Sequence, residues 1–282
     1  MRDIRRRIRT VRNIQQITKA LKMVAAARLQ RAQSRATAAR PYADEMLAVM
    51  RHLASVGAEI EHPLLEVREP VNIGVLMITS DRGMAGSYNT IVIRRVSEII
   101  GPYEKERVKL IAVGKKGRAV FAKQGFEIAA GFSMPSAEVG FAEARIISRT
   151  IGEIFVSRQV DMVHVVYTRF YSAIRQKVTD LMLLPATPPE DELPEHVENY
   201  IFEPMPEELL GALLPRYDDT QVYRAVLESL ASEHGARMTA MTAATDSGAE
   251  MIDRLTLDFH RARQAAITKE IAEIVGGAEA LK

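Results

Sequence analysis

Two glycine-containing stretches are the first places in this sequence where binding chemistry could occur. Residues 80–87 read S-D-R-G-M-A-G-S after an apolar run, and residues 114–117 read G-K-K-G. Such turns between a strand and a helix can hold phosphate, because free backbone amides point at the anion. Neither stretch has the G-x-G-x-x-G or G-x-x-x-x-G-K-[ST] spacing of nucleotide-binding loops. We therefore expect tight strand-to-helix turns, with Ser87 as a helix cap.

Histidines and cysteines offer no catalytic or metal-binding pattern. The histidines show no H-E-x-x-H spacing, there is no G-x-S-x-G elbow, and the absence of cysteine excludes disulfides, thiolate zinc sites and thiol catalysis. His164 falls in an apolar run and is expected in the core or at its edge. His234 and His260 are expected at a surface or an interface. The sequence therefore predicts no catalytic residue, no metal site and no cofactor on this chain.

The elements that position these residues alternate between short apolar runs and helical patterns. Strands are expected at residues 71–79, 107–113, 126–131 and 160–168, with an edge strand at 173–183. Helices are expected at residues 88–100, 116–123 and 138–157. This alternation predicts a mostly parallel sheet with right-handed crossovers, in a Rossmann-like α/β domain at 71–184.

Two long helical segments flank this domain, at residues 1–60 and 218–282. Asp218, Asp219 and Thr220 are expected to cap the second helix, and Gly276 and Gly277 are expected to end it. The second helix, counted from Thr220 to Val275, has about 56 residues and would be about 84 Å long. It is therefore too long to fit inside a compact globule formed by a chain of this length. The two helices are therefore expected to bury their apolar stripes against each other as a coiled coil, with Pro41 bending the first.

The predicted stripes consist of apolar and small residues at helical spacing. In the first helix they are Ile4, Ile8, Val11, Ile14, Thr18, Leu21, Ala25, Leu29, Ala32, Ala36 and Ala39. In the second they are Val226, Leu230, Ala240, Met241, Ala244, Met251, Leu255, Phe259, Ala262, Ala266 and Ile274.

Composition and charge narrow the class of protein further. A hydrophobic content of 47% permits a core, and no apolar run is long enough to span a bilayer or to form a secretory signal. Residues 1–40 hold ten arginines and two lysines against Asp3, which suggests an acidic partner. This segment has no aromatic residue for base stacking, so a solvated helix face is favoured over nucleic-acid binding. Residues 61–70 are expected to form a linker, and residues 185–217 an acidic, proline-rich connection.

Motifs at both ends of the chain resemble one known family. Residues 14–27 read I-Q-Q-I-T-K-A-L-K-M-V-A-A-A, residues 233–241 read E-H-G-A-R-M-T-A-M, and residues 261–271 read R-A-R-Q-A-A-I-T-K-E-I. These stretches resemble the terminal signatures of the γ subunit of F-type ATP synthases. The T-S-D-R-G turn at 79–83 and G-S-Y-N at 86–89 resemble that family's central domain.

The resemblance implies a rotor shaft with an antiparallel coiled coil. Its partners would be the α and β subunits of the catalytic ring, the ε subunit and the membrane c-ring, with ATP, ADP and magnesium bound by partner subunits. The shaft would work at the cytoplasmic face of the bacterial plasma membrane as a peripheral subunit with no catalysis of its own. The resemblance also places coupling or partner contacts at six residues: Met23, Arg237, Arg263, Gln264, Thr268 and Glu270. Two other readings stay open, a nucleotide-binding α/β enzyme and a passive coiled-coil adaptor.

Overall fold

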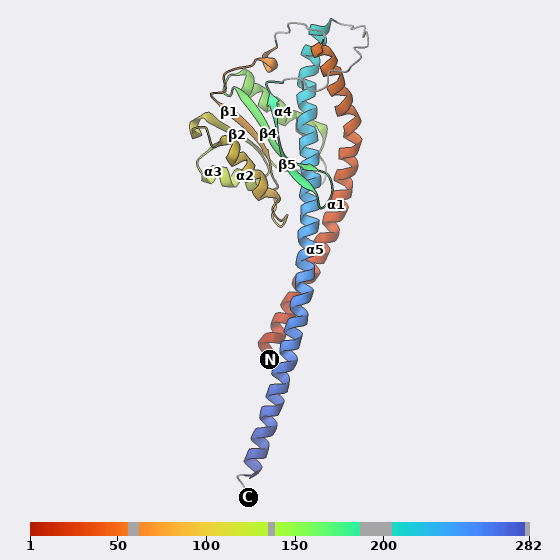
Figure 1. Cartoon of the computed structure of the whole chain (residues 1–282), viewed down its shortest axis with the longest axis vertical. Helices are drawn as coiled ribbons and strands as arrows, with labels where there is room; N and C mark the ends of the chain where they lie inside the picture. The colour runs from red at the N-terminus through yellow and green to blue at the C-terminus, as the bar shows by residue number, and fades with distance from the viewer. Residues whose placement is uncertain (56–61, 135–138, 187–204, 280–282) are drawn as a thin grey trace. The chain divides into compact units, whose positions relative to one another are not determined.

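The computed structural model describes residues 1–55, 62–134, 139–186 and 205–279 of the chain. It divides into two compact units. One unit is formed by Met1–Ala25 with Met238–Lys282, and the other by Ala26–Arg237. The long helices α1 (Arg2–Ser55) and α5 (Pro206–Glu279) each contribute to both units (Figure 1). Among the described residues, no helix has the length and hydrophobicity that crossing a membrane requires.

The second unit contains one five-stranded sheet with the strand order β3-β2-β1-β4-β5 (Figure 1). Four strands are parallel, and β5 pairs antiparallel with β4 at one edge. The strands are β1 (Ile73–Ile78), β2 (Val108–Val113), β3 (Glu127–Phe132), β4 (Met162–Phe170) and β5 (Gln176–Leu184). All residues of β1 are buried, as expected for a central parallel strand that is covered on both faces. The predicted parallel sheet and its edge strand are confirmed.

Three helices connect these strands, namely α2 (Tyr88–Ile100), α3 (Lys115–Lys123) and α4 (Phe141–Val156). The core on one face of the sheet joins Val92 and Val96 of α2, Phe121 of α3, and Val75 and Met77 of β1. Because side chains alternate along a strand, the intervening residues of β1 point to the opposite face. The three helices lie where the sequence predicted them.

The segment expected to be a linker is docked on the α/β domain where the structure describes it. Pro63–Leu65 forms a short 3₁₀ helix, η1, and a second one, η2, covers Lys105–Arg107. Leu64 is buried, and its carbonyl oxygen accepts a hydrogen bond from the backbone amide of Ala186 at 2.8 Å. Most of the expected proline-rich connection, residues 187–204, lies outside the described residues.

The seam of α1 in the first unit follows a seven-residue repeat. Its less exposed positions alternate steps of four and three residues, with Leu21 and Lys22 both half-buried at one step: Ile4, Ile8, Val11, Gln15, Thr18, Leu21, Lys22 and Ala25. The prediction of Ile14 in this seam is wrong, because Ile14 is 53% exposed and Gln15 takes the inward position. A coiled coil keeps a 3.5-residue period, so the repeat places the polar Gln15 inside and the apolar Ile14 outside. Pro41 lies within α1, and the helix continues past it to Ser55.

The predicted start of α5 near Thr220 is wrong. The helix begins at Pro206, and Asp218, Asp219 and Thr220 are buried inside it instead of capping it. Pro206 is suited to a first helical position, where no amide hydrogen bond is required. Leu210 and Leu214 lie one helical turn apart and belong to a row of buried residues on one face of α5. Because burial of these two leucines stabilises helix, α5 begins before Asp218. The row consists of Leu210, Leu214, Asp218, Val222, Val226, Leu230 and His234.

Three further predictions about α5 need correction. Met251 and Ile274 were expected in the apolar stripe but are 52% and 71% exposed, and the helix runs through Gly276 to Glu279. The seam instead includes Ile252, because the 3.5-residue repeat shifts the inward position by one residue. Ile274 lies beyond Phe259 and makes no seam contact among the described residues. Because α5 continues through Gly276 and Gly277 to Glu279, the glycine pair does not act as a helix stop.

Polar groups set the register of the paired helices in the first unit. The hydroxyl groups of Thr18 and Thr245 lie 2.8 Å apart, and the Gln15 amide donates to the Thr245 carbonyl oxygen at 3.3 Å. Gly248 lies against the Gln15 side chain, where a Cβ would meet it at 3.5 Å. A polar contact in a coiled-coil seam is satisfied in one register only, so these residues fix the alignment of α1 with α5.

We expect Thr18→Val to weaken this register contact by about 1 kcal/mol, because the Thr245 hydroxyl then keeps only the Met241 carbonyl oxygen of its own helix as a partner. Adding Thr245→Val should recover most of the loss, since two apolar groups of similar shape then face each other. Amide hydrogen exchange across residues 10–25 and 240–252 measures both effects. Ile14→Ala, on the exposed side of the same helix, is the control and should leave exchange within the seam unchanged. Equal exchange in Thr18→Val and the unsubstituted chain would contradict the role of the pair.

Candidate functional site

The loop after β1 closes the position where an α/β sheet would bind phosphate. The first three amides of the α3 region donate to this loop: Lys115 to the Asp81 Oδ1 atom at 2.9 Å, Lys116 to the Ser80 carbonyl oxygen at 3.1 Å, and Gly117 to the Thr79 Oγ1 atom at 3.0 Å. These are the donors that would otherwise face an anion at a helix N-terminus. The arrangement therefore favours the structural interpretation of the S-D-R-G turn.

Gly114 makes this close approach possible. Its φ angle is +91°, and a Cβ atom at this position would lie 2.0 Å from the Thr79 carbonyl oxygen. Only glycine fits without moving the backbone of either segment.

The same loop is locked to the start of α2 by a side chain other than the expected cap. Ser87 occupies the N-cap position but makes no side-chain capping bond, because its backbone is not in the extended conformation that aims the hydroxyl at the helix amides. Asn89 instead accepts from the Ser80 amide at 2.9 Å and donates to the Ser80 Oγ atom at 2.8 Å. The prediction of a Ser87 side-chain cap is therefore wrong.

The middle of α5 covers the carboxyl end of β4, within the second unit. The Ser229 Oγ atom accepts from the Thr168 amide at 3.3 Å, and the Ser232 hydroxyl donates to the Thr168 carbonyl oxygen at 2.9 Å. Gly235 permits this close packing, because a Cβ there would lie 3.4 Å from the Ala173 Cα atom and 2.9 Å from the Gln176 Nε2 atom. The two serines supply polar contacts that a purely apolar helix could not offer.

This contact lies at the switch point of the sheet. From β1 the chain proceeds to β2 on one side, while β4 lies on the other side. Doubly wound proteins bind ligands in the crevice outside the carboxyl ends of two such strands. Here the chain's own helix packs against the β4 side of that crevice, and the β1 loop is tied to α3.

Arg237 connects α5 to the β1 loop. Its Nη2 atom lies 2.7 Å from the Glu233 Oε1 atom and donates to the Gly83 carbonyl oxygen at 3.3 Å. The side chains of Arg237 and Glu233 are only 11% and 8% exposed, so the pair is shielded from water. Burial raises the pKa of Glu233, the Arg237 guanidinium lowers it in part, and the Asp81 carboxylate raises it again. Arg237 is therefore required to keep a buried carboxylate charged.

His234 lies in the same cluster and is buried, contrary to the predicted surface or interface position. Only 2% of the residue is exposed. Burial, followed by repulsion from Arg237 and Arg28, lowers the pKa of His234 to about 4. The neutral ring places its Nδ1 atom 3.3 Å from the Arg237 Nη1 atom, so Nδ1 accepts and the proton is assigned to Nε2. His260 is exposed, as predicted.

The other predicted site residues lie in the first unit, on exposed helix surfaces. Met23 on α1 is 61% exposed, and four residues of α5 are exposed: Arg263, Gln264, Thr268 and Glu270. At about 100° per residue, these four side chains span roughly 160° of the α5 circumference, so they share one half of the helix. Exposed apolar side chains of the same half lie among them: Ile267, Ile271, Ile274 and Val275. The structure thus groups these residues on one face and places Arg237 in a separate, buried cluster.

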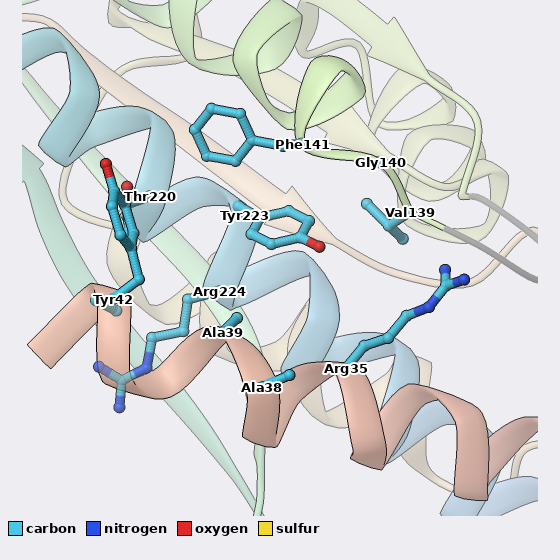
Figure 2. A pocket seen from close by; sticks show the side chains of 11 residues that line it. Arg35, Ala38, Ala39, Tyr42, Val139, Gly140, Phe141, Thr220, Tyr223 and Arg224 are labelled. Carbon is cyan, nitrogen blue, oxygen red and sulfur yellow. The ribbon is translucent and has the colours of Figure 1, made fainter.

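A hollow of about 630 Å³ opens between α1, α4 and α5 within the second unit (Figure 2). The rings of Phe141 and Tyr223 meet edge to face with their centroids 5.5 Å apart, and Ala38 and Ala39 of α1 lie across from them. Its size falls within the range of ligand-sized pockets, and its walls are mostly apolar. It contains none of the predicted site residues.

The partners that surround Arg237 were not predicted from the sequence. Glu233 precedes Arg237 by four residues, which places both side chains on one helix face, and this spacing was the signal that could have identified the pair. Gly83 could not be assigned in the same way, because its carbonyl oxygen becomes a partner only after the β1 loop folds. Among the described residues, no cluster of histidine and acidic side chains could hold a metal ion.

The fold and the helix-covered sheet end are those of a helical-stalk protein with an attached α/β domain. The family model described as ATP synthase matches residues 1–281. The ATP synthase gamma chain of Desulfitobacterium hafniense is 50% identical over 283 residues, covering 100% of this chain and 99% of its own length. That of Heliobacterium modesticaldum is 47% identical over 289 residues with the same coverage. The chain belongs to the ATP synthase gamma-chain family, which confirms the resemblance seen in the sequence.

Solved structures agree with this fold. The central stalk and c-ring structure of Tetrahymena thermophila mitochondrial ATP synthase contains a chain 26% identical with a TM-score of 0.60, covering 81% of this chain and 99% of that one. A chain of Euglena gracilis mitochondrial ATP synthase in rotational state 3 has a TM-score of 0.73 at 21% identity, covering 99% and 94%. The second match supports the fold alone.

We expect Arg237→Ala to destabilise the folded chain by about 3 kcal/mol at pH 7, because it leaves the Glu233 carboxylate buried without its cation. The pKa of Glu233 is already raised, and losing Arg237 raises it further. The variant can therefore protonate Glu233 at lower pH, and the destabilisation should shrink as the pH falls from 7 towards 4.5. The pKa of His234 would also rise in the variant, because the repulsion from Arg237 is lost. His234 can then take up a proton more easily at low pH, which also makes the destabilisation smaller as the pH falls.

Urea unfolding at pH 7 and pH 5, followed by circular dichroism, measures this dependence. Arg237→Lys is the matched variant, since it keeps the charge but loses the planar fork that reaches both Glu233 and Gly83. It should recover part of the stability. A loss that is the same at both pH values would show that the charge of Glu233 does not depend on Arg237.

Proposed function

We propose that this chain is the non-catalytic rotor shaft of a proton-translocating F-type ATP synthase. It would couple proton flow through the membrane c-ring to ATP synthesis or hydrolysis at catalytic sites of the α and β subunits. The observation that carries this proposal is the exposed, partly apolar end of α5, on a chain that matches the gamma-chain family along its whole length.

The C-terminal part of α5 exposes apolar side chains, as a helix that binds a partner does. The Arg5 guanidinium of α1 lies 5.4 Å from the centre of the Phe259 ring of α5. Residues 260–279 continue the helix for about 30 Å. Ile267 and Ile271 are 47% and 56% exposed on this stretch, and apolar groups on a single helix gain stability when another surface covers them. A bearing formed by the α and β subunits would supply that surface.

The exposed site residues would make the contacts that change as the shaft turns. Met23 would face the acidic loop of the β subunit, while Arg263 and Gln264 would engage a β loop, with Thr268 and Glu270 beside them. An arginine fork binds a carboxylate with two parallel hydrogen bonds, and the adjacent amide can both donate and accept. Contacts that differ between catalytic sites would bias each site towards a different conformation.

Arg237 would contribute to coupling indirectly. It ties α5 to the Gly83 carbonyl oxygen and thereby helps to hold the α/β domain on the helix. Force on the domain would then pass to the shaft without slippage between them.

The c-ring named with the Tetrahymena structure supports a c-ring partner for this chain. As the family resemblance implies, the α/β domain would contact the ε subunit and the c-ring. ATP, ADP and magnesium would be bound by the partner subunits, because the amides at the start of α3 already bond to the β1 loop. The complex would place this chain at the cytoplasmic face of a bacterial plasma membrane as a peripheral subunit.

This geometry gives no support to the nucleotide-binding enzyme. The adaptor interpretation differs from the rotor in one measurable respect, since an adaptor would stay fixed relative to its partners.

Rotation tests the proposal directly. Glu104 has a side chain 76% exposed, and the chain has no native cysteine, so Glu104→Cys gives a single attachment point for a bead or a gold rod. With the α and β subunits fixed to a surface, we expect ATP to drive rotation of the probe in one direction. A non-hydrolysable ATP analogue is the control and should stop it. A probe that stays still while the complex hydrolyses ATP would favour a fixed adaptor.

The double variant Arg263→Ala with Gln264→Ala tests the proposed loop contact. We expect assembly or coupled ATP turnover to fall about tenfold or more, since charge-assisted bonds to a carboxylate are lost. Helicity of the isolated chain should not change, because alanine is a strong helix former.

Lys269→Ala with Glu273→Ala is the matched control. These side chains are 77% and 64% exposed on the opposite side of the same helix and pair only with each other among the described residues. Turnover should therefore be unaffected by this pair of substitutions. Equal turnover in both double variants would show that Arg263 and Gln264 do not engage the ring.

A further inference from the structure

A second cavity in the α/β unit has no place in the proposed rotor function. It has a volume of about 580 Å³ and lies between α4, the η1 turn and the beginning of α5. Leu64, Gly152, Val156 and Pro215 provide apolar walls. Its size is that of a pocket for a small organic molecule.

One buried carboxyl group in this cavity has an oxygen atom without a hydrogen-bond partner among the described residues. Asp218 is 4% exposed, and its Oδ1 atom makes no hydrogen bond within the described part of the chain. Burial, followed by the neighbouring Asp219 carboxylate, raises the pKa of Asp218 well above its usual range. A buried acceptor without a donor costs free energy, so a molecule that supplied a donor here would be bound favourably.

The other charged groups that line the cavity balance one another. Burial raises the pKa of Asp219, and a hydrogen bond from Ser148 and the charges of Arg145 and Arg149 of α4 oppose this rise in part. Glu153 of α4 adds a second negative charge against the two arginines. His62 of η1 is neutral at pH 7, because burial lowers its pKa and its Nδ1 atom accepts from the Leu64 amide at 3.2 Å. Of the two aspartates, Asp218 is therefore the one on which no arginine of the described residues acts.

We propose that this cavity binds a small organic cation, an amidinium or ammonium group on an apolar body, with the Asp218 carboxylate as its anchor. The cation would donate hydrogen bonds to Asp218, and the apolar body would lie against the walls formed by Leu64, Val156 and Pro215. An amidinium matches the carboxylate best, since two parallel N–H groups meet two oxygen atoms.

Binding of such a cation is linked to a proton. When Asp218 is protonated, its O–H bond breaks on binding, the electron pair stays on the carboxylate and the proton passes to the buffer. The cation keeps its own proton. Binding should therefore tighten as the pH rises, and up to one proton should be released for each cation bound.

Benzamidine is the probe, and isothermal titration of the full chain is the measurement. Titrations in two buffers with different ionisation enthalpies give the number of protons released at each pH. We expect saturable binding to one site with the pH dependence described above. Asp218→Asn should weaken binding about tenfold or more and abolish proton release, because the carboxylate that meets the cation is gone.

Two controls separate this site from general binding. Asp219→Asn removes the neighbouring carboxylate and should retain benzamidine binding, while neutral benzamide has the same ring without the charge and should bind about tenfold more weakly. Circular dichroism and thermal unfolding establish that each variant folds. No saturable binding to the unsubstituted chain, or equal binding and proton release in Asp218→Asn, would overturn the proposal.

Discussion

The buried ion pair of Arg237 and Glu233 is the interaction on which the α/β unit depends. Removing two charges from water is costly unless both are paired and hydrogen-bonded, and Arg237 meets this requirement by contacting Glu233, His234 and the Gly83 carbonyl oxygen together. His234 stays neutral because burial, followed by repulsion from Arg237 and Arg28, lowers its pKa. The β1 loop must present a carbonyl oxygen at this point, so its conformation and the position of α5 are fixed by the same contact.

Periodicity predicted the sheet well, because buried parallel strands need nothing but apolar residues in short runs. It was less reliable in the coiled coil. Ile14 and Met251 are apolar and lie at helical spacing, yet both face outward, while Gln15 and Ile252 face inward. The difference between a 3.5- and a 3.6-residue period is small over one turn and decides the inward position over several turns. A seam that uses glutamine, threonine and glycine also carries little hydrophobic signal.

The beginning of α5 and the burial of His234 depend on tertiary contacts that local patterns do not contain. Aspartates 218 and 219 are typical helix caps, but leucines 210 and 214 find burial one and two turns earlier and extend the helix past them. His234 looks like a surface residue until Gly235 allows α5 to approach the β4–β5 hairpin. Arg263 and Gln264 were identified through the resemblance alone, since exposed polar residues have no periodic signature of function.

The position of α5 on the sheet also explains how an α/β fold can serve a mechanical role. In enzymes of this architecture the carboxyl end of the sheet must stay open to admit a ligand. Here Ser229 and Ser232 bond to Thr168 of β4, while Asp81 and Thr79 bond to the α3 amides. The polar groups of the loop and the helix that could have bound a substrate form hydrogen bonds within the chain instead. Such contacts are short and directional, so within the second unit they resist sliding of the covering segment of α5 along the sheet.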